Sequence, residues 1–102
     1  MSLSKRFLKS KPVCKVMFKL PKEGAKEAKK VHLVGEFNDW KERATPMKKL
    51  KDGSFSVTLD LETGKEYHFR YLLDGTDWEN DWDADRYEFS EFADCENSVV
   101  SV

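Results

Sequence analysis

One stretch organises the whole chain: Val31-His32-Leu33-Val34-Gly35-Glu36-Phe37-Asn38-Asp39-Trp40. Apolar residues recur in its first part at a period of two, which is typical of a β-strand with one buried face. The pattern breaks at Asn38-Asp39, because short side chains that bond nearby backbone groups favour tight turns. Trp40 follows at once. A large aromatic side chain at the exit of a strand either covers the core or is presented to a ligand.

The composition is that of one domain with a hydrophilic surface. The chain has 102 residues, of which 39% are hydrophobic and 36% charged, and this length can bury a single core. No apolar run approaches the ~20 residues that span a bilayer. The first residues carry cations but lack the apolar segment of a secretory signal. We therefore expect a cytoplasmic protein that does not bind membranes.

Charge is distributed unevenly along the chain. Residues 1–51 contain 15 Lys or Arg and 5 acids, and residues 52–102 contain 3 and 14. A basic half of this kind can indicate a nucleic-acid-binding arm. In a β-sandwich, however, early and late strands lie side by side, so the two halves neutralise each other in space. We do not expect nucleic acid as a partner.

Short alternating segments separated by turn signals predict an all-β sandwich. In residues 13–20, every second side chain from Cys14 to Leu20 falls on one apolar face. The turns are marked by Asp52-Gly53, Thr63-Gly64 and Asp74-Gly75. The other strands are expected over residues 30–37, 47–50 (the weakest pattern), 54–59, 65–73 and 97–102, and residues 76–96 are expected to contain only short extended pieces.

The N-terminal segment, residues 1–12, differs in its expected structure from the β-sandwich domain that follows, residues 13–102. Residues 2–10 are compatible with a short helix that Ser2 or Ser4 caps and Pro12 stops. Only packing on the domain could hold so short a helix.

Cysteine and histidine give no metal-binding pattern. Cys14 and Cys95 are far apart in the chain, and we expect two free thiols, although a bridge between them is conceivable. His32 and His68 lie within expected strands without a cysteine neighbour, so no zinc site is expected.

Three tryptophans occur in polar, turn-rich surroundings. Trp40 follows Asn-Asp, Trp78 comes three residues after a turn, and Trp82 lies between two aspartates. Such positions are less often fully buried than positions inside a strand. An exposed indole suits the apolar face of a sugar ring, and stacking of this kind contributes on the order of 1–2 kcal/mol per ring.

Four segments of this sequence resemble the carbohydrate-binding module family 48, which includes the glycogen- and starch-binding early-set domains of AMP-activated kinase β-subunits and of branching and debranching enzymes. Residues 31–40 are similar to its V-x-L-x-G-x-F-N-x-W signature, and residues 67–75 to its Y-x-Y-K-F-x-V-D-G motif. Trp78 matches the tryptophan after that motif, shifted by one residue, and residues 97–102 match the closing N-N-x-x-x-V. The resemblance runs from about Val13 to the C-terminus.

The resemblance implies an early-set, immunoglobulin-like β-sandwich that binds α-1,4-glucans on one face. The family's two stacking tryptophans fall on Trp40 and Trp78. Its cationic hydrogen-bond donor falls on Arg70, which alternation in residues 65–73 also turns away from the apolar face. Its sugar-binding asparagine falls on Asn97.

The sequence departs from the family at several positions. Arg70 replaces the usual lysine, which keeps the charge and changes its geometry. Trp82 stands where proline is frequent, so it is either an additional platform or a cover for the sandwich edge. Ser98 replaces the second asparagine of the closing motif.

The acidic run of residues 77–85 raises two further interpretations. Residues 81–85 imitate the start of a calcium loop, but Arg86 and Phe92 occupy its sixth and twelfth positions, where glycine and glutamate are needed. Paired carboxylates also suggest glycoside hydrolysis, yet the chain is shorter than the roughly 250 residues of a catalytic barrel. We expect no enzyme activity, catalytic residue, metal or cofactor.

The sequence thus predicts a free-standing, non-catalytic module that binds glycogen, starch or maltooligosaccharides. The alternative is a sandwich with a degraded sugar site that docks on a glycogen- or starch-metabolising enzyme, or on a second copy of itself.

Overall fold

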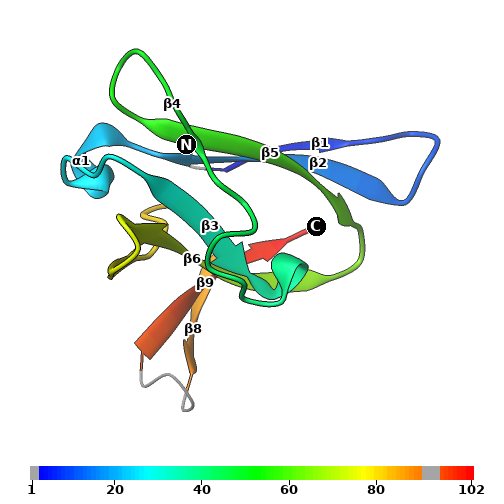
Figure 1. The fold of residues 1–102 in the computed structure, drawn as a ribbon. Helices are drawn as coiled ribbons and strands as arrows, with labels where there is room; N and C mark the ends of the chain where they lie inside the picture. The colour runs from blue at the N-terminus through cyan, green and yellow to red at the C-terminus, as the bar shows by residue number, and fades with distance from the viewer. Residues whose placement is uncertain (1–2, 91–94) are drawn as a thin grey trace.

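The computed structural model describes residues 3–90 and 95–102, and it consists of two antiparallel β-sheets packed face to face (Figure 1). The first sheet contains, in spatial order, β1 (Leu3–Phe7), β2 (Val13–Leu20), β5 (Phe55–Glu62) and β4 (Lys48–Lys49). The second contains β3 (Val31–Gly35), β6 (Glu66–Leu73), β9 (Cys95–Ser101) and β8 (Arg86–Ser90), with β7 (Asp77–Glu79) also paired to β6. This is the predicted all-β, immunoglobulin-like sandwich.

Alternation in β2 and β6 builds the core between the sheets. From Cys14 to Leu20, every second side chain of β2 is fully buried. Across the gap, the Phe69 ring of β6 meets the Phe18 ring edge-on, with 5.0 Å between their centroids. Complete burial of one phenylalanine stabilises the fold by about 2–3 kcal/mol. The alternation predicted from the sequence is therefore confirmed in both strands.

Leu3–Phe7 of the N-terminal segment form a strand, so the short helix considered for residues 2–10 is wrong. The β1 strand pairs antiparallel with β2, from Leu3 opposite Phe18 to Phe7 opposite Cys14. This pairing satisfies the backbone with hydrogen bonds and buries Leu3 to 5% exposure. An isolated two-turn helix lacks comparable support. Pro12 lies in the connection between the two strands, not at the end of a helix.

The stretch 31–40 ends its strand earlier than expected. The β3 strand stops at Gly35, and the 3₁₀-helix η1 (Glu36–Asn38) follows. Gly35 is required because a Cβ atom there would lie 2.6 Å from the backbone oxygen of His68 on β6. The Asn38 amide closes the turn: it accepts from the Gly35 N–H at 3.1 Å and donates to the Leu33 carbonyl at 2.9 Å.

Within residues 3–90 and 95–102, helical structure is confined to η1 and one turn, α1 (Lys22–Ala25), at opposite ends of β3 (Figure 1). The α1 turn lies in the connection between β2 and β3. In the described part of the chain, no helix has the length and apolar character needed to cross a bilayer.

Candidate functional site

The second sheet has a face turned away from the core, which we call the outer face. Core-facing Phe69 and Tyr71 of β6 are fully buried, so the side chain of Arg70 between them points to the outer face. Residues directly opposite each other in antiparallel strands share a face. Leu72 of β6 lies opposite Trp78 of β7, which places Arg70 and Trp78 on the same face.

Arg70 and Trp78 are in direct contact there. The guanidinium Cζ atom of Arg70 lies 4.5 Å from the centroid of the Trp78 ring, within the range of a cation–π interaction. The Trp78 side chain remains 38% exposed. The contact helps to orient the indole on a short edge strand, and it leaves more than a third of that residue's surface exposed.

Asn97 lies beside this pair. Phe69 on β6 is opposite Ser98 on β9, so Arg70 and Asn97 are the next residues along the two strands, and both face outward. Two buried atoms on this face, Nε of Arg70 and Oδ1 of Asn97, have no hydrogen-bond partner among residues 3–90 and 95–102. A buried donor or acceptor without a partner costs about 1–3 kcal/mol. A donor and an acceptor, both covered from solvent, thus lie without partners in one place.

Trp40 emerges from the turn that follows β3. Its backbone N–H donates to the Gly35 carbonyl at 2.8 Å, and its φ of 58° lies in the left-handed region. The side chain is 36% exposed, and among the described residues its ring forms no aromatic or cation–π contact. Gly35 pairs with Phe69, the neighbour of Arg70, so the turn begins one residue from the Arg70 position on the adjacent strand.

Trp82 occupies a different place. A Cβ atom built on Gly24 of α1 would lie 3.5 Å from two atoms of the Trp82 ring, so this indole lies against α1 at the end of the sandwich. The preceding residue, Asp81, is buried and accepts a hydrogen bond from the Tyr71 hydroxyl on the core side of β6. The structure therefore brings Arg70, Trp78 and Asn97 together and leaves Trp82, which is 54% exposed, outside that group.

His68 also belongs to the outer face, although sequence reasoning gave it no role. It lies two residues before Arg70 on β6, and its backbone N–H donates to the Glu36 carboxylate at 2.6 Å. Its Nε2 atom lies 3.5 Å from the Glu88 carboxylate on β8. Alternation over residues 65–73 correctly predicts that His68 faces outward. The sequence pattern does not predict its contact with Glu88, because that contact depends on where β8 lies in the sheet.

An ion-pair network lies on the same sheet. Arg86 of β8 donates to Glu66 at 2.6 and 3.0 Å and to Glu88 at 2.6 Å. These hydrogen bonds from Arg86, helped by one from the Ser101 hydroxyl, lower the pKa of Glu66 to about 2.

Two carboxylates of the acidic run, residues 77–85, form hydrogen bonds to other strands of the sandwich. Asp81 bonds Tyr71, and burial raises the pKa of the Tyr71 hydroxyl, with the nearby Asp81 carboxylate adding to the effect. Asp85 accepts from the Lys5 ammonium at 2.6 Å and from the Ser101 N–H at 2.7 Å. In the described part of the chain, no three His, Cys, Asp or Glu side chains are arranged to hold a metal ion. Cys14 is a buried free thiol, and the side chain of Cys95 lies outside the described residues.

A β-sandwich with a cation-backed indole and unsatisfied polar atoms on one face has features expected of a sugar-binding module. Comparison with known proteins agrees. The family model of carbohydrate-binding module 48 (isoamylase N-terminal domain) matches residues 22–88, and the chain belongs to this family.

One curated relative is similar over a shorter region. It is the 1,4-alpha-glucan branching enzyme GlgB of Photobacterium profundum, which is 44% identical over 46 residues. The match covers 44% of this chain and 6% of the enzyme. The chain therefore corresponds to a small part of that relative.

Proposed function

We propose that this domain binds α-1,4-glucan chains, such as glycogen, starch or maltooligosaccharides, on the outer face and without catalysing a reaction. Trp40 and Trp78 stack on glucose rings, and Arg70 and Asn97 bond the hydroxyl groups between them. The observation that carries the proposal is the pair of unsatisfied buried atoms, Arg70 Nε and Asn97 Oδ1, next to an exposed indole.

Sugar hydroxyls fit these atoms because a hydroxyl both donates and accepts. One hydroxyl can accept from Arg70 Nε, and it or a neighbouring hydroxyl can donate to Asn97 Oδ1. Both atoms are covered in the free protein, so the Arg70 and Asn97 side chains must turn toward the glucan to form these bonds. The bonds then remove a cost that the free protein carries. An apolar ligand would satisfy neither atom.

The cation–π contact determines how Trp78 meets the glucan. Because Arg70 lies over the ring, the exposed remainder of the indole is the part available to the apolar face of a glucose unit. Two stacking contacts of about 1–2 kcal/mol each, with a few hydrogen bonds, give binding in the high-micromolar to millimolar range. Such affinity suits a polymer with many equivalent sites.

The family supports a role in binding rather than catalysis, because carbohydrate-binding modules are not catalytic domains. The similar segment of a 1,4-alpha-glucan branching enzyme supports α-glucan as the sugar class. We propose that the domain binds glucan by itself and acts in the cytoplasm, where glycogen or a related polymer is the partner.

A second candidate is protein docking on a glycogen- or starch-metabolising enzyme, or self-association. It is favoured by two large apolar side chains on edge strands: Phe7 of β1 and Phe89 of β8 are each 57% exposed. Edge strands can pair with another chain.

A titration separates the two candidates. Tryptophan fluorescence and amide shifts are followed with maltoheptaose for the wild type, for Trp40→Ala with Trp78→Ala, and for Trp82→Ala as the matched control. Glucan binding predicts a saturable response that the double variant loses and the control keeps. No response up to about ten millimolar ligand, well above the expected affinity, refutes glucan binding, and a dimer in light scattering would then support docking.

A further inference from the structure

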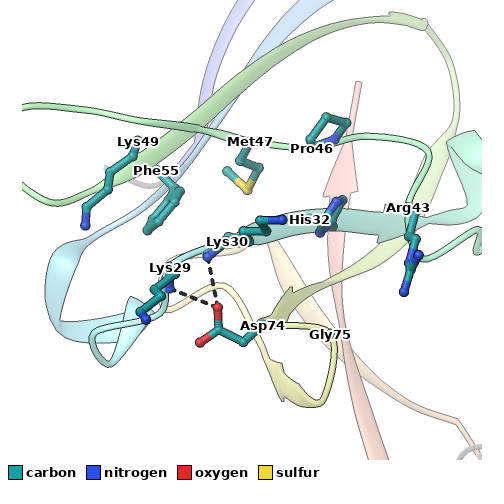
Figure 2. Close-up of a pocket in the computed structure, with 11 residues that line it drawn as sticks. Lys29, Lys30, His32, Arg43, Pro46, Met47, Lys49, Phe55, Asp74 and Gly75 are labelled. Carbon is teal, nitrogen blue, oxygen red and sulfur yellow. Dashed lines mark hydrogen bonds between the residues drawn. The ribbon is translucent and has the colours of Figure 1, made fainter.

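A hollow lies at the end of the sandwich where the segment between α1 and β3 meets the turn between β6 and β7 (Figure 2). Its volume is about 780 Å³, within the range of roughly 300–1,000 Å³ typical of small-molecule sites. The walls come from the start of β3, the segment between η1 and β4, the start of β5 and the β6–β7 turn. We call this hollow the basic pocket.

Positive charge dominates the basic pocket. Lys29, Lys30, Arg43 and Lys49 line it together with His32, and Asp74 is the acid among the lining residues. Within residues 3–90 and 95–102, none of the four lysine and arginine side chains forms an ion pair. Lysines elsewhere, such as Lys5, Lys15 and Lys26, do pair with carboxylates. The pocket therefore concentrates cations that the fold leaves uncompensated.

Asp74 acts on the backbone and not on these cations. Its Oδ1 atom accepts hydrogen bonds from the backbone N–H groups of Lys29 and Lys30, each at 2.9 Å (Figure 2). The Asp74 N–H in turn donates to the Lys30 carbonyl at 2.8 Å. These three bonds fix the two lysine backbones at the rim, while their ammonium groups remain available.

The inner wall of the pocket is apolar. Phe55 is 2% and Met47 8% exposed, so both present an edge to the hollow and are otherwise packed in the core. Lys49 Nζ lies 5.9 Å from the centroid of the Phe55 ring, which places one cation directly above this wall. A ligand that fits both features has a compact anionic group and a carbon-rich body.

We propose that the basic pocket binds a phosphate monoester of the size of a sugar phosphate. The phosphate dianion accepts hydrogen bonds from several cations at once, and the sugar body covers the wall formed by Phe55 and Met47. The site is separate from Arg70, Trp78 and Asn97, so the inference does not rest on glucan binding. The ester is either a free sugar phosphate or a phosphate carried by a glucan chain.

The test uses glucose 6-phosphate, inorganic phosphate and glucose as probes, followed by calorimetry and amide shifts. We expect saturable binding of glucose 6-phosphate, with shifts at residues 29–32 and 74–75, and weaker binding of inorganic phosphate and of glucose. Lys30→Gln with Arg43→Gln removes two pocket cations and should weaken binding about ten-fold or more. Lys9→Gln with Lys11→Gln removes the same charge from the β1–β2 connection and should leave the affinity within about two-fold.

Three results would overturn the proposal. The first is no binding of glucose 6-phosphate up to about ten millimolar, the limit set for a weak specific site. The second is an equal loss in both double variants, which indicates only general charge attraction. The third is equal affinity for inorganic phosphate, which shows that the apolar wall is unused.

Two further arms identify the source of the phosphate and separate this site from the outer face. If the phosphate is carried by a glucan, phosphorylated maltodextrin binds more tightly than both its dephosphorylated form and glucose 6-phosphate, and the pocket variant loses that advantage. If the ester is free, the phosphorylated and dephosphorylated polymers bind alike. Trp40→Ala with Trp78→Ala should retain glucose 6-phosphate binding; its loss there would refute two separate sites.

Discussion

The guanidinium of Arg70 lies over the indole ring of Trp78, with 4.5 Å between Cζ and the ring centroid. The two residues belong to neighbouring strands, β6 and β7, and the contact is made on the face of the sheet that does not pack in the core. We therefore propose two tasks for this side chain: it orients the aromatic ring, and its Nε donor, which has no partner among the described residues, bonds a ligand.

Replacing Arg70 tests both tasks. Arg70→Ala removes the support of the ring and the donor, so we expect maltoheptaose affinity to fall about ten-fold, with a loss of near-ultraviolet dichroism from Trp78. Arg70→Lys keeps the charge and part of the contact and should lose about three-fold. Arg6→Ala on β1 of the other sheet is the control and should not change affinity. Unchanged affinity in Arg70→Ala would contradict the proposed site.

Replacing Asn97 by an apolar residue should preserve or raise stability while it weakens glucan binding. Its side chain is 5% exposed and its Oδ1 has no partner among the described residues, so Asn97→Leu replaces an unsatisfied amide by an apolar group of similar size. We expect the free energy of unfolding in urea to stay unchanged or to rise by about 1 kcal/mol. Maltoheptaose affinity should fall about ten-fold in the same variant. A destabilised variant with normal affinity would show that Asn97 is purely structural.

Gly35 should not tolerate a side chain. Gly35→Ala places a methyl group 2.6 Å from the His68 carbonyl oxygen and 2.8 Å from the Phe69 Cβ atom, and strands β3 and β6 would have to separate. We expect a loss of about 2–4 kcal/mol in chemical denaturation. The control is Gly64→Asn, at a left-handed position with no atom within 4 Å of the new Cβ, which should cost less than about 1 kcal/mol. Similar losses in both would exclude the steric explanation.

Acid should weaken the fold through Glu66. Its pKa is about 2 in the folded protein, below the ordinary 4.5, because Arg86 donates hydrogen bonds to the ionised form. Folding therefore favours the deprotonated carboxylate, and this contribution is complete above about pH 4.5 and is lost as the pH falls toward 2. The melting temperature of Arg86→Gln should consequently depend less on pH in this interval than that of the wild type. Lys11→Gln, which removes a charge without a partner in the described chain, should keep the wild-type slope.

The strands β2 and β6, which each have one buried face, could be predicted from the sequence, whereas the edge strands β1 and β8 could not. The β2 strand has the expected bounds, and β6 begins one residue later than expected, because alternation directly reports burial. The β1 strand carries no such pattern beyond Leu3; it exists because β2 offers it a free edge. All but the last residue of β8 are exposed, so its sequence of charged and aromatic residues contains no signal for a strand.

In the candidate site, too, local alternation predicts some features, and others depend on how distant strands pair. The outward direction of Arg70 came from alternation alone, and the roles of Trp40, Trp78 and Asn97 came from the family resemblance. The unsatisfied atoms depend on the pairing of β6 with β9, which no local pattern specifies. The basic pocket depends on four separate segments meeting at one end of the sandwich, and a linear pattern cannot show that meeting.

The position of β6 in the sheet has a further consequence. It is hydrogen-bonded to β3 on one side and to β9 and β7 on the other, so the backbone that carries Arg70 is held rigid before any glucan arrives. If this face binds glucan as proposed, we expect little conformational entropy to be lost at this residue and most of the adjustment to fall on Trp40, which is carried by a turn. Recognition by this face should therefore combine a preorganised side chain, Arg70, with an adaptable one, Trp40. Such a combination suits polymer chains whose local shape varies.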